Sequence, residues 1–306
     1  MLFAGLGLLV AGGLGAFAQE SDLARPGTIN YIEGSAAIDG RPLPEQSTKD
    51  VAVASGQVLS TAQGKAEMLL TPGIFFRLND NSAVKMVSPS LTHTVVELQA
   101  GRAAVEVDQI FDQNEVQVVM NGKTTQLLKR GFYEFNADAG QVRVFDGKAA
   151  VDAGTGSGKW TVVKGDHELA FATEGKPAKF DTDKQKDELY KWSSLRSQYM
   201  AEADGQTYGD YETPGWYWNP YFGGYGFFGP DPFWSPFGWG FYGRGFYGGG
   251  FYGRPYYGHR YIGRGYVGRG YAGRGYAGHG FTAGRPGGFG GGFHSGGGFH
   301  GGGGHR

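Results

Sequence analysis

Few residues in this sequence have the types and the spacing that catalysis requires. The segment Gly154–Lys159 (GTGSGK) resembles a phosphate-binding loop, which needs four residues between its first Gly and the Gly-Lys pair and then Ser or Thr. Trp160 stands at that last position and the first spacing is too short, so we interpret the segment as a hairpin loop. The chain has no cysteine, which excludes disulfides, cysteine-ligated metal sites and thiol catalysis.

The histidines and carboxylates do not form a motif for nucleophilic or metal chemistry. His93 and His167 stand among turn and strand residues, with no nucleophile in a shared motif. Glu106, Asp108 and Asp112 are close in sequence, and we interpret them as a solvated strand edge rather than a calcium site. The other histidines stand in glycine-rich sequence that does not pre-organise a metal site, and we expect them to be solvent-exposed, with loose binding of a divalent metal by the last three as the alternative: His259, His279, His294, His300 and His305. We expect no enzymatic activity and no cofactor.

Arginine and tyrosine alternate in a near-repeat of five residues near the end of the chain. A guanidinium over an aromatic ring gains roughly 0.5–1 kcal/mol at an exposed site, so many such pairs make a weakly self-adhesive chain. Self-association or adhesion to envelope polymers is our preferred interpretation, and a flexible spacer is a second one. In the cytoplasm the same pattern is typical of an RNA-binding tail. The candidate interaction residues are Arg264, Tyr266, Arg269, Tyr271, Arg274 and Tyr276.

The composition changes near Gly205. Residues 205–306 hold 37 of the 58 glycines and 30 of the 46 aromatic residues, with eight arginines, no lysine and three acidic residues. The net charge of −1 therefore combines a body at −6 (20 basic against 26 acidic residues) with a tail at +5 (8 against 3). Ordering so much glycine costs roughly 1–2 kcal/mol per residue, and the sequence predicts that 205–306 is a disordered low-complexity tail.

The N-terminal segment is typical of an export signal. Leu2–Phe17 is an unbroken run of Leu, Phe, Val, Ala and Gly, and Ala-Phe-Ala at 16–18 matches the small-residue pattern of a signal-peptidase site. The run is short for a membrane span, which needs roughly 20 apolar residues. It lacks the Lys or Arg residues with which a signal peptide usually begins. The sequence predicts a signal peptide at 1–18 and a periplasmic, extracellular or cell-surface protein; an uncleaved anchor is the alternative.

Residues 28–172 are patterned as short strands separated by Gly, Asn and Asp. Phe76-Arg77-Leu78 and Val105-Glu106-Val107 alternate apolar and polar residues, which predicts that one face packs on a core while the other meets water. Asn121-Gly122 and Asp146-Gly147 supply the positive φ angles of tight hairpins.

The recurring glycines between these strands have irregular spacings, whereas a strict solenoid keeps a fixed period. The sequence therefore predicts an all-β domain, an irregular β-solenoid or rolled β-sandwich of about fifteen short strands, with a closed barrel as the alternative.

After Pro177 the period changes to that of a helix. Thr182 and Gln185 fit a capping box, and an apolar stripe recurs every three or four residues at Leu189, Trp192, Leu195 and Tyr199. We predict an amphipathic helix over 181–204 that packs this stripe on the β-domain; a helix for a partner or a membrane surface is the alternative.

The β-domain resembles the FecR-type periplasmic domain, which is the exported half of iron-transport regulators and also occurs in other envelope proteins. The matching pieces cover nearly half of the chain, and Phe132 departs from the Thr that the family usually has. They are Val58–Thr61, Ala66–Leu70, Val96–Val105, Lys129–Phe135 and Val142–Val151. The resemblance implies a β-scaffold outside the cytoplasm.

The family's regulators carry a cytoplasmic sigma-binding segment and a membrane helix before this domain, and a leader at 1–18 leaves no room for either. We therefore expect an exported interaction or scaffold protein, whose β-domain recognises a protein or polymer such as a polysaccharide and whose tail adds multivalent adhesion. A periplasmic ligand-sensing or signal-relay module acting with a membrane partner is the first alternative. RNA binding through the tail is the second.

Overall fold

The computed structural model describes residues 24–44, 50–152, 158–172, 176–204, 215–219, 223–228 and 233–241. Its contacts divide the chain into two units, Met1–Pro255 and Tyr256–Arg306, and every described residue belongs to the first. The predicted signal peptide at 1–18 lies outside the described residues, as do the six arginines and tyrosines of the five-residue repeat.

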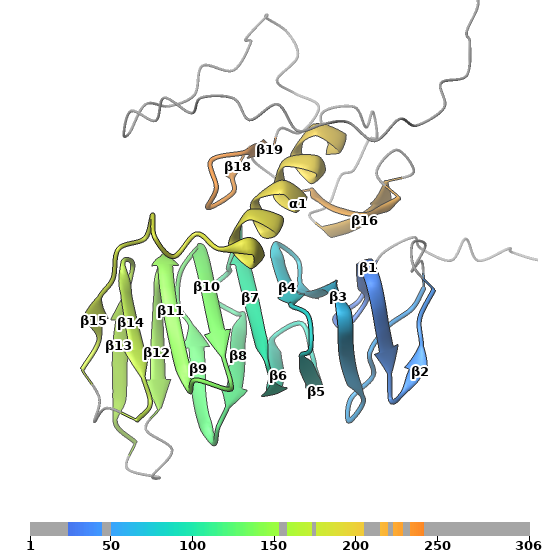
Figure 1. Cartoon of the computed structure of the whole chain (residues 1–306). Helices are drawn as coiled ribbons and strands as arrows, with labels where there is room; N and C mark the ends of the chain where they lie inside the picture. The colour runs from blue at the N-terminus through green and yellow to red at the C-terminus, as the bar shows by residue number, and fades with distance from the viewer. Residues whose placement is uncertain are drawn as a thin grey trace, which may run out of the picture. The chain divides into compact units, whose positions relative to one another are not determined.

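The first unit is dominated by one fifteen-stranded sheet (Figure 1). Along its main path the strand order is β13-β12-β9-β8-β6-β5-β3-β4-β7-β10-β11-β14-β15, and β1 pairs with both β3 and β2. The strands are β1 Ile29–Ile38, β2 Arg41–Pro42, β3 Val58–Thr71, β4 Ile74–Leu78, β5 Ala83–Pro89, β6 His93–Ala100, β7 Arg102–Val107, β8 Glu115–Met120, β9 Lys123–Leu127, β10 Gly131–Asn136, β11 Gln141–Asp146, β12 Lys148–Asp152, β13 Trp160–Lys164, β14 His167–Ala170 and β15 Ala178–Lys179.

The long strand β3 divides this sheet into two halves. Its residues 58–60 pair with β5, whereas its residues 66–71 pair with β4. We call β5, β6, β8, β9, β12 and β13 the open half-sheet, and β4, β7, β10, β11, β14 and β15 the covered half-sheet. At the far end from β3, strand β13 of the open half-sheet lies close to β11 and β14 of the covered one. The sheet is therefore curled around a core that both halves share.

That main core is built from the inward side chains of both half-sheets, including Phe76, Val105, Val118, Phe135 and Val144. The all-β prediction is confirmed, and of the predicted forms the structure has the rolled one. All strand pairs within the sheet are antiparallel except β6–β8, so its described strands do not stack as the parallel rungs of a solenoid.

Two predicted turns show why glycine and asparagine stand where they do. Asn121 and Gly122 both have positive φ (51° and 71°) and join β8 to β9 in a two-residue hairpin, as expected for Asn-Gly. Gly147 has φ 99°, and a Cβ there would lie 2.3 Å from the hydroxyl of Tyr133. That hydroxyl donates to the carbonyl of Lys129 and accepts from the amide of Lys148 (3.1 Å), so the turn allows close packing that any side chain would prevent.

Helix α1 (Glu188–Asp204) begins later than predicted and presents a partly different face. Asp187, not Thr182, is its N-cap, because the Asp187 carboxylate accepts a hydrogen bond from the amide of Tyr190 (3.1 Å). Leu195 and Tyr199, expected in the packed stripe, are 44% and 49% exposed. The buried face consists of Leu189, Ser193, Arg196, Ser197, Met200, Ala203 and Asp204. The predicted stripe is therefore correct for Leu189 and Trp192, which pack on the β-domain, and wrong for Leu195 and Tyr199, because polar residues of the helix pair with buried charges of the sheet.

The structure also differs from the prediction of a disordered tail beginning at residue 205. We call residues 215–241 the aromatic segment; its described parts form the strand pairs β16 (Gly215–Asn219) with β17 (Gly224–Phe228), and β18 (Phe233–Trp234) with β19 (Gly240–Phe241). Trp216, Tyr225 and Phe241 are buried against Leu69 and Phe75 of the sheet. The aromatic residues here therefore supply the packing that the many glycines cannot, and the cover of the sheet extends beyond α1.

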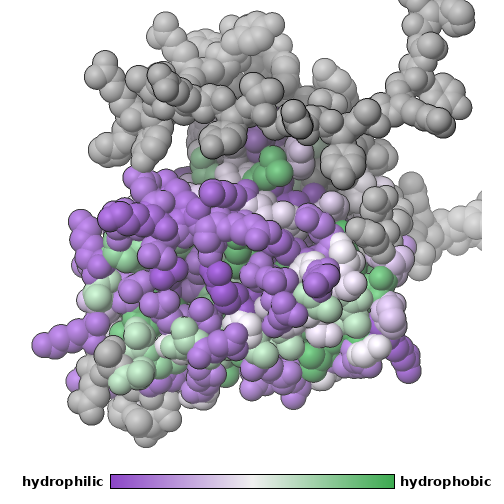
Figure 2. Space-filling view, in the orientation of Figure 1, coloured by the Kyte–Doolittle hydropathy of each residue, from purple (hydrophilic) through white to green (hydrophobic). Residues whose placement is uncertain are grey.

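Hydrophilic residues dominate the face of the β-domain seen in Figure 2, and the apolar residues among them form only small groups. Among the described residues, no helix is both long and apolar enough to cross a membrane.

Candidate functional site

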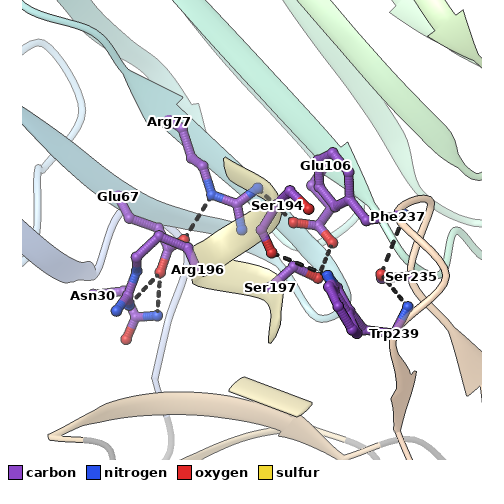
Figure 3. Close-up of polar contacts among 10 residues, drawn as sticks. All are labelled: Asn30, Glu67, Arg77, Glu106, Ser194, Arg196, Ser197, Ser235, Phe237 and Trp239. Carbon is purple, nitrogen blue, oxygen red and sulfur yellow. Dashed lines mark hydrogen bonds and ion pairs between the residues drawn. The ribbon is translucent and has the colours of Figure 1, made fainter. Parts of the chain in front are cut away.

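A buried arginine in the covered half-sheet is the centre of an ion network (Figure 3). The Nε of Arg77 on β4 donates to Oε2 of Glu67 on β3 at 2.8 Å, and its Nη1 forms an ion pair with Oε2 of Glu106 on β7. All three side chains are completely buried. The sequence-based expectation that Arg77 and Glu106 face water is therefore wrong, because α1 and the aromatic segment cover this side of the sheet.

Helix α1 contributes a second arginine and a hydroxyl to the same network. Arg196 donates from Nη2 to Oε1 of Glu67 (2.9 Å), and the hydroxyl of Ser197 donates to Oε1 of Glu106 (2.7 Å). The guanidinium of Arg196 also lies 4.0 Å from the centroid of the Tyr31 ring. Two arginines thus face two glutamates, and each glutamate is shared between the sheet and the helix.

The aromatic segment is tied to this network by polar contacts as well as by packing. Asn30 on β1 donates to Glu67 (2.8 Å) and to the carbonyl of Tyr225 (3.1 Å), and it accepts from the amide of Tyr225 (2.6 Å). The indole of Trp239 donates to the carbonyl of Ser194 on α1 (3.1 Å). Sheet, helix and aromatic segment therefore form one hydrogen-bonded unit.

Glu67 and Arg77 stay charged although both are buried. Burial alone would raise the pKa of Glu67, but Arg196 and Arg77 lower it to about 2. Burial alone would lower the pKa of Arg77, and Glu106 and Glu67 instead hold it above its usual value. The charges are kept because each has an opposite charge within hydrogen-bond distance.

A second charge cluster lies at the start of α1. Arg102 of β7 contacts Glu134 of β10 (3.4 Å) and forms an ion pair with Asp187, while Arg143 of β11 bonds Glu168 (3.0 Å) and lies 3.6 Å from Glu134. Burial and the nearby Asp187 raise the pKa of Glu134 to about 7, although both arginines oppose the rise. Glu134 therefore titrates near neutral pH beneath the N-terminus of the helix.

A pocket of about 640 Å³ opens at the C-terminal end of β7, in the covered half-sheet. Its walls are the β7–β8 and β9–β10 connections, and seven of its eleven lining residues are polar or charged. The lining residues are Asp108, Gln109, Ile110, Phe111, Asp112, Asn114, Gln126, Leu127, Leu128, Lys129 and Arg130.

Asp108 connects the pocket to the ion network. It is 2% exposed, although the sequence placed it with Glu106 on a solvated strand edge. Burial and the neighbouring Glu106 raise the pKa of Asp108 well above its usual value, against the opposing effect of Arg77 and Arg130. Among the described residues, neither carboxylate oxygen of Asp108 has a donor, so the neutral acid is the form that fits this site.

The mouth of the pocket is apolar on one side and basic on the other. Phe111 and Leu128 are 38% and 37% exposed, and Lys129 and Arg130 are exposed beside Leu128. Asn114 braces the β7–β8 connection, since its side chain accepts from the amide of Phe111 (3.1 Å) and donates to the carbonyl of Leu91 (2.8 Å). The pocket is thus formed by loops that a rigid sheet and an internal hydrogen bond position.

The residues singled out in the sequence lie mostly elsewhere. His93 bonds Glu115 (2.9 Å) on the exposed side of β6, and His167 contacts the carbonyl of Gly165 (2.8 Å). Asp112 lines the pocket, but the described residues contain no cluster of His and carboxylate side chains suited to a metal. Glu67, Arg196 and the pocket were not predicted from the sequence. The double Phe at 75–76 before Arg77 was the signal that both faces of β4 are covered.

Comparison with known proteins gives few matches. No family model and no curated protein matches the chain. Two crystal structures of candidate anti-sigma factors from Parabacteroides distasonis are similar, with 18% and 15% identity and TM-scores of 0.33 and 0.34. The matches cover 42% and 45% of this chain and 60% and 63% of those chains, so this chain spans less than two thirds of their length.

Proposed function

We propose that this chain is an exported interaction protein of the cell envelope, whose β-domain recognises a polymer or a protein. The observation that carries the proposal is the open pocket of about 640 Å³, in which polar groups and exposed apolar side chains converge between two connections of a rigid sheet. The leader-like segment 1–18 supports export, and the Arg–Tyr repeat supports multivalent adhesion by the part of the chain after residue 241.

The pocket supports recognition because its loops are held in place. The β7–β8 connection is fixed by Asn114 and by the amide of Asp108, which donates to the carbonyl of Gly73 (2.8 Å). The amide of Leu128 in the β9–β10 connection donates to the carbonyl of Lys148 (2.9 Å). Preorganised loops bind with a smaller loss of conformational entropy than mobile ones do.

The experiment is a sedimentation assay with the full-length protein and washed envelope fragments. Leu128→Ser removes an exposed apolar side chain from the pocket mouth, and Val162→Ser removes one of similar exposure from β13. We expect the first variant to weaken binding by about tenfold, through the loss of roughly 1–2 kcal/mol of apolar contact, and the second to bind like the wild type. Equal binding by all three proteins would contradict pocket-based recognition.

The role of the terminal part is tested in the same assay by full-length chains with Tyr266, Tyr271 and Tyr276 replaced by Ser. Because many weak contacts together bind more tightly than any one of them does, we expect the amount of protein that sediments with the fragments to fall further with each substitution. N-terminal sequencing and fractionation of the wild type test export. Recovery in the cytosol with residues 1–18 attached would overturn the proposal and favour RNA binding.

The second candidate function is a periplasmic signal-relay module, and the polar underside of α1 favours it. The face of α1 against the sheet carries Ser193, Arg196 and Ser197, so specific polar contacts hold the helix in addition to apolar ones. A ligand that alters the Asp108–Glu106 pair would alter a contact of Ser197. Faster amide exchange in α1 after envelope fragments are added would support relay, and unchanged exchange would exclude it.

A further inference from the structure

We propose that the pocket between the β7–β8 and β9–β10 connections binds a carboxylated sugar chain, with Lys129 and Arg130 holding the carboxylate. Gln109, Gln126 and Asp108 then receive the sugar hydroxyls. This inference rests on the proposed function, since it specifies which polymer the β-domain recognises.

The two cations at the mouth are adjacent in sequence and available to a ligand. Lys129 and Arg130 are both exposed, and neither forms an ion pair within the part of the chain that the structure describes. A guanidinium can bind a carboxylate through two parallel hydrogen bonds, and a neighbouring ammonium adds a point charge. Asp112 also lines the pocket and offsets one of the two positive charges, whereas burial favours the protonated, neutral form of Asp108, so the pocket keeps a net attraction for an anion.

The inner wall offers acceptors that need donors. Both oxygens of Asp108 and Oε1 of Gln109 are buried without a hydrogen-bond partner among the described residues. A buried acceptor without a donor is costly, and hydroxyl groups donate and accept at the same time. A protonated Asp108 has the same property, since it can donate toward Glu106 and accept from a ligand hydroxyl. A polyhydroxylated ligand therefore fits the wall better than an apolar side chain does.

The rim supplies the apolar contact that a sugar ring requires. Phe111 and Leu128 stand partly exposed on opposite connections, and a pyranose ring presents flat C–H faces together with its hydroxyls. Seven of the eleven lining residues are polar or charged, whereas a pocket for an apolar peptide anchor is mostly hydrophobic. The combination of an aromatic rim, amide walls and paired cations points to an acidic polysaccharide rather than to a peptide.

The test is calorimetric titration of the full-length protein with an oligogalacturonate, and with a neutral maltooligosaccharide of equal length. We expect the carboxylated oligomer to bind at least about tenfold more tightly, with an affinity that falls as salt increases. The Lys129→Ala/Arg130→Ala variant should abolish this preference. The matched control, Arg41→Ala/Lys164→Ala, removes two exposed cations from β2 and β13 and should leave it unchanged.

The outcomes separate this inference from the proposed function. If envelope fragments bind through the pocket but neither oligosaccharide does, the polymer is not an acidic sugar and the inference is overturned while the proposed function stands. Equal affinity for both oligosaccharides, or loss of the preference in the Arg41/Lys164 control, also overturns it. Tighter binding of an acidic peptide than of the oligogalacturonate would assign the pocket to proteins instead.

Discussion

The two halves of the curled sheet share a core and differ on their other face. In the open half-sheet the burial alternates strictly along β8, where Val116, Val118 and Met120 are buried and the residues between them are half-exposed. In the covered half-sheet all five residues of β4 are buried, Arg77 included. The difference follows from α1 and the aromatic segment, which lie on the outer face of the covered half-sheet and replace water there.

This comparison shows how charges can occupy the interior of a β-domain. On the open half-sheet, Lys85 of β5 stands opposite Glu97 of β6, and both are partly exposed. On the covered half-sheet, Arg77 of β4 stands opposite Glu67 of β3, and both are completely buried. Their remaining contacts come from Glu106 of β7 and from Arg196 of the helix. A basic and an acidic residue on neighbouring strands thus form a partly solvated pair in one half and the centre of a packed interface in the other.

The largest contrast between the halves is expected from removing one cation from each. Arg77→Met leaves Glu67 and Glu106 short of a buried partner, and we expect it to lower the free energy of unfolding by about 3–5 kcal/mol. Lys85→Met in the open half-sheet should change it by less than about 0.5 kcal/mol. Urea unfolding of the full-length variants measures both values. Similar losses of stability in the two variants would contradict the difference between a buried cation in the covered half-sheet and a solvated one in the open half-sheet.

One tryptophan of the aromatic segment and one of the open half-sheet test the apolar part of the cover. Trp216 is 2% exposed and meets Phe75 edge-on, with ring centroids 4.6 Å apart, whereas Trp160 on β13 is 42% exposed. Trp216→Ala should cost about 3 kcal/mol through loss of buried area and a cavity. Trp160→Ala should cost less than about 1 kcal/mol. A small effect at Trp216 would show that the aromatic segment does not cover the sheet in solution.

A smaller effect is expected from the titration of Glu134 under α1. Its pKa is about 7 in the folded chain against 4.5 for the ordinary group, so the folded state binds the proton more tightly and stability falls as pH rises from 4.5 to 7. Glu134→Gln should therefore raise the free energy of unfolding at pH 8 by about 2 kcal/mol, after allowance for lost contacts with Arg102 and Arg143. At pH 4 the variant and the wild type should be equally stable. A loss of stability at pH 8 would contradict the raised pKa.

The sequence predicts the open half-sheet well, because its strands obey local rules. Alternation along β8 and the Asn121-Gly122 hairpin depend on one buried face and on backbone preferences, both of which are written in neighbouring residues. The prediction of an all-β domain followed by a helix therefore holds.

The covered half-sheet could not be predicted in the same way, since its cover comes from residues far along the chain. Arg196 lies 129 residues after Glu67, and Tyr225 lies 195 residues after Asn30. Local patterning assigns Arg77 and Glu106 to water, and it assigns Leu195 rather than Arg196 to the packed face of the helix. Glycine content likewise suggested that residues 215–241 lack structure, although their aromatic side chains pack on Leu69 and Phe75.

The most direct test of the account is a double-mutant cycle between the sheet and the helix. Glu67→Gln, Arg196→Met and the double variant are compared by urea unfolding of the full-length protein. Because the two side chains share a buried hydrogen bond of 2.9 Å, we expect a coupling free energy of about 1.5–3 kcal/mol. Additive losses, with a coupling free energy near zero, would show that α1 is not held on the sheet by this ion network.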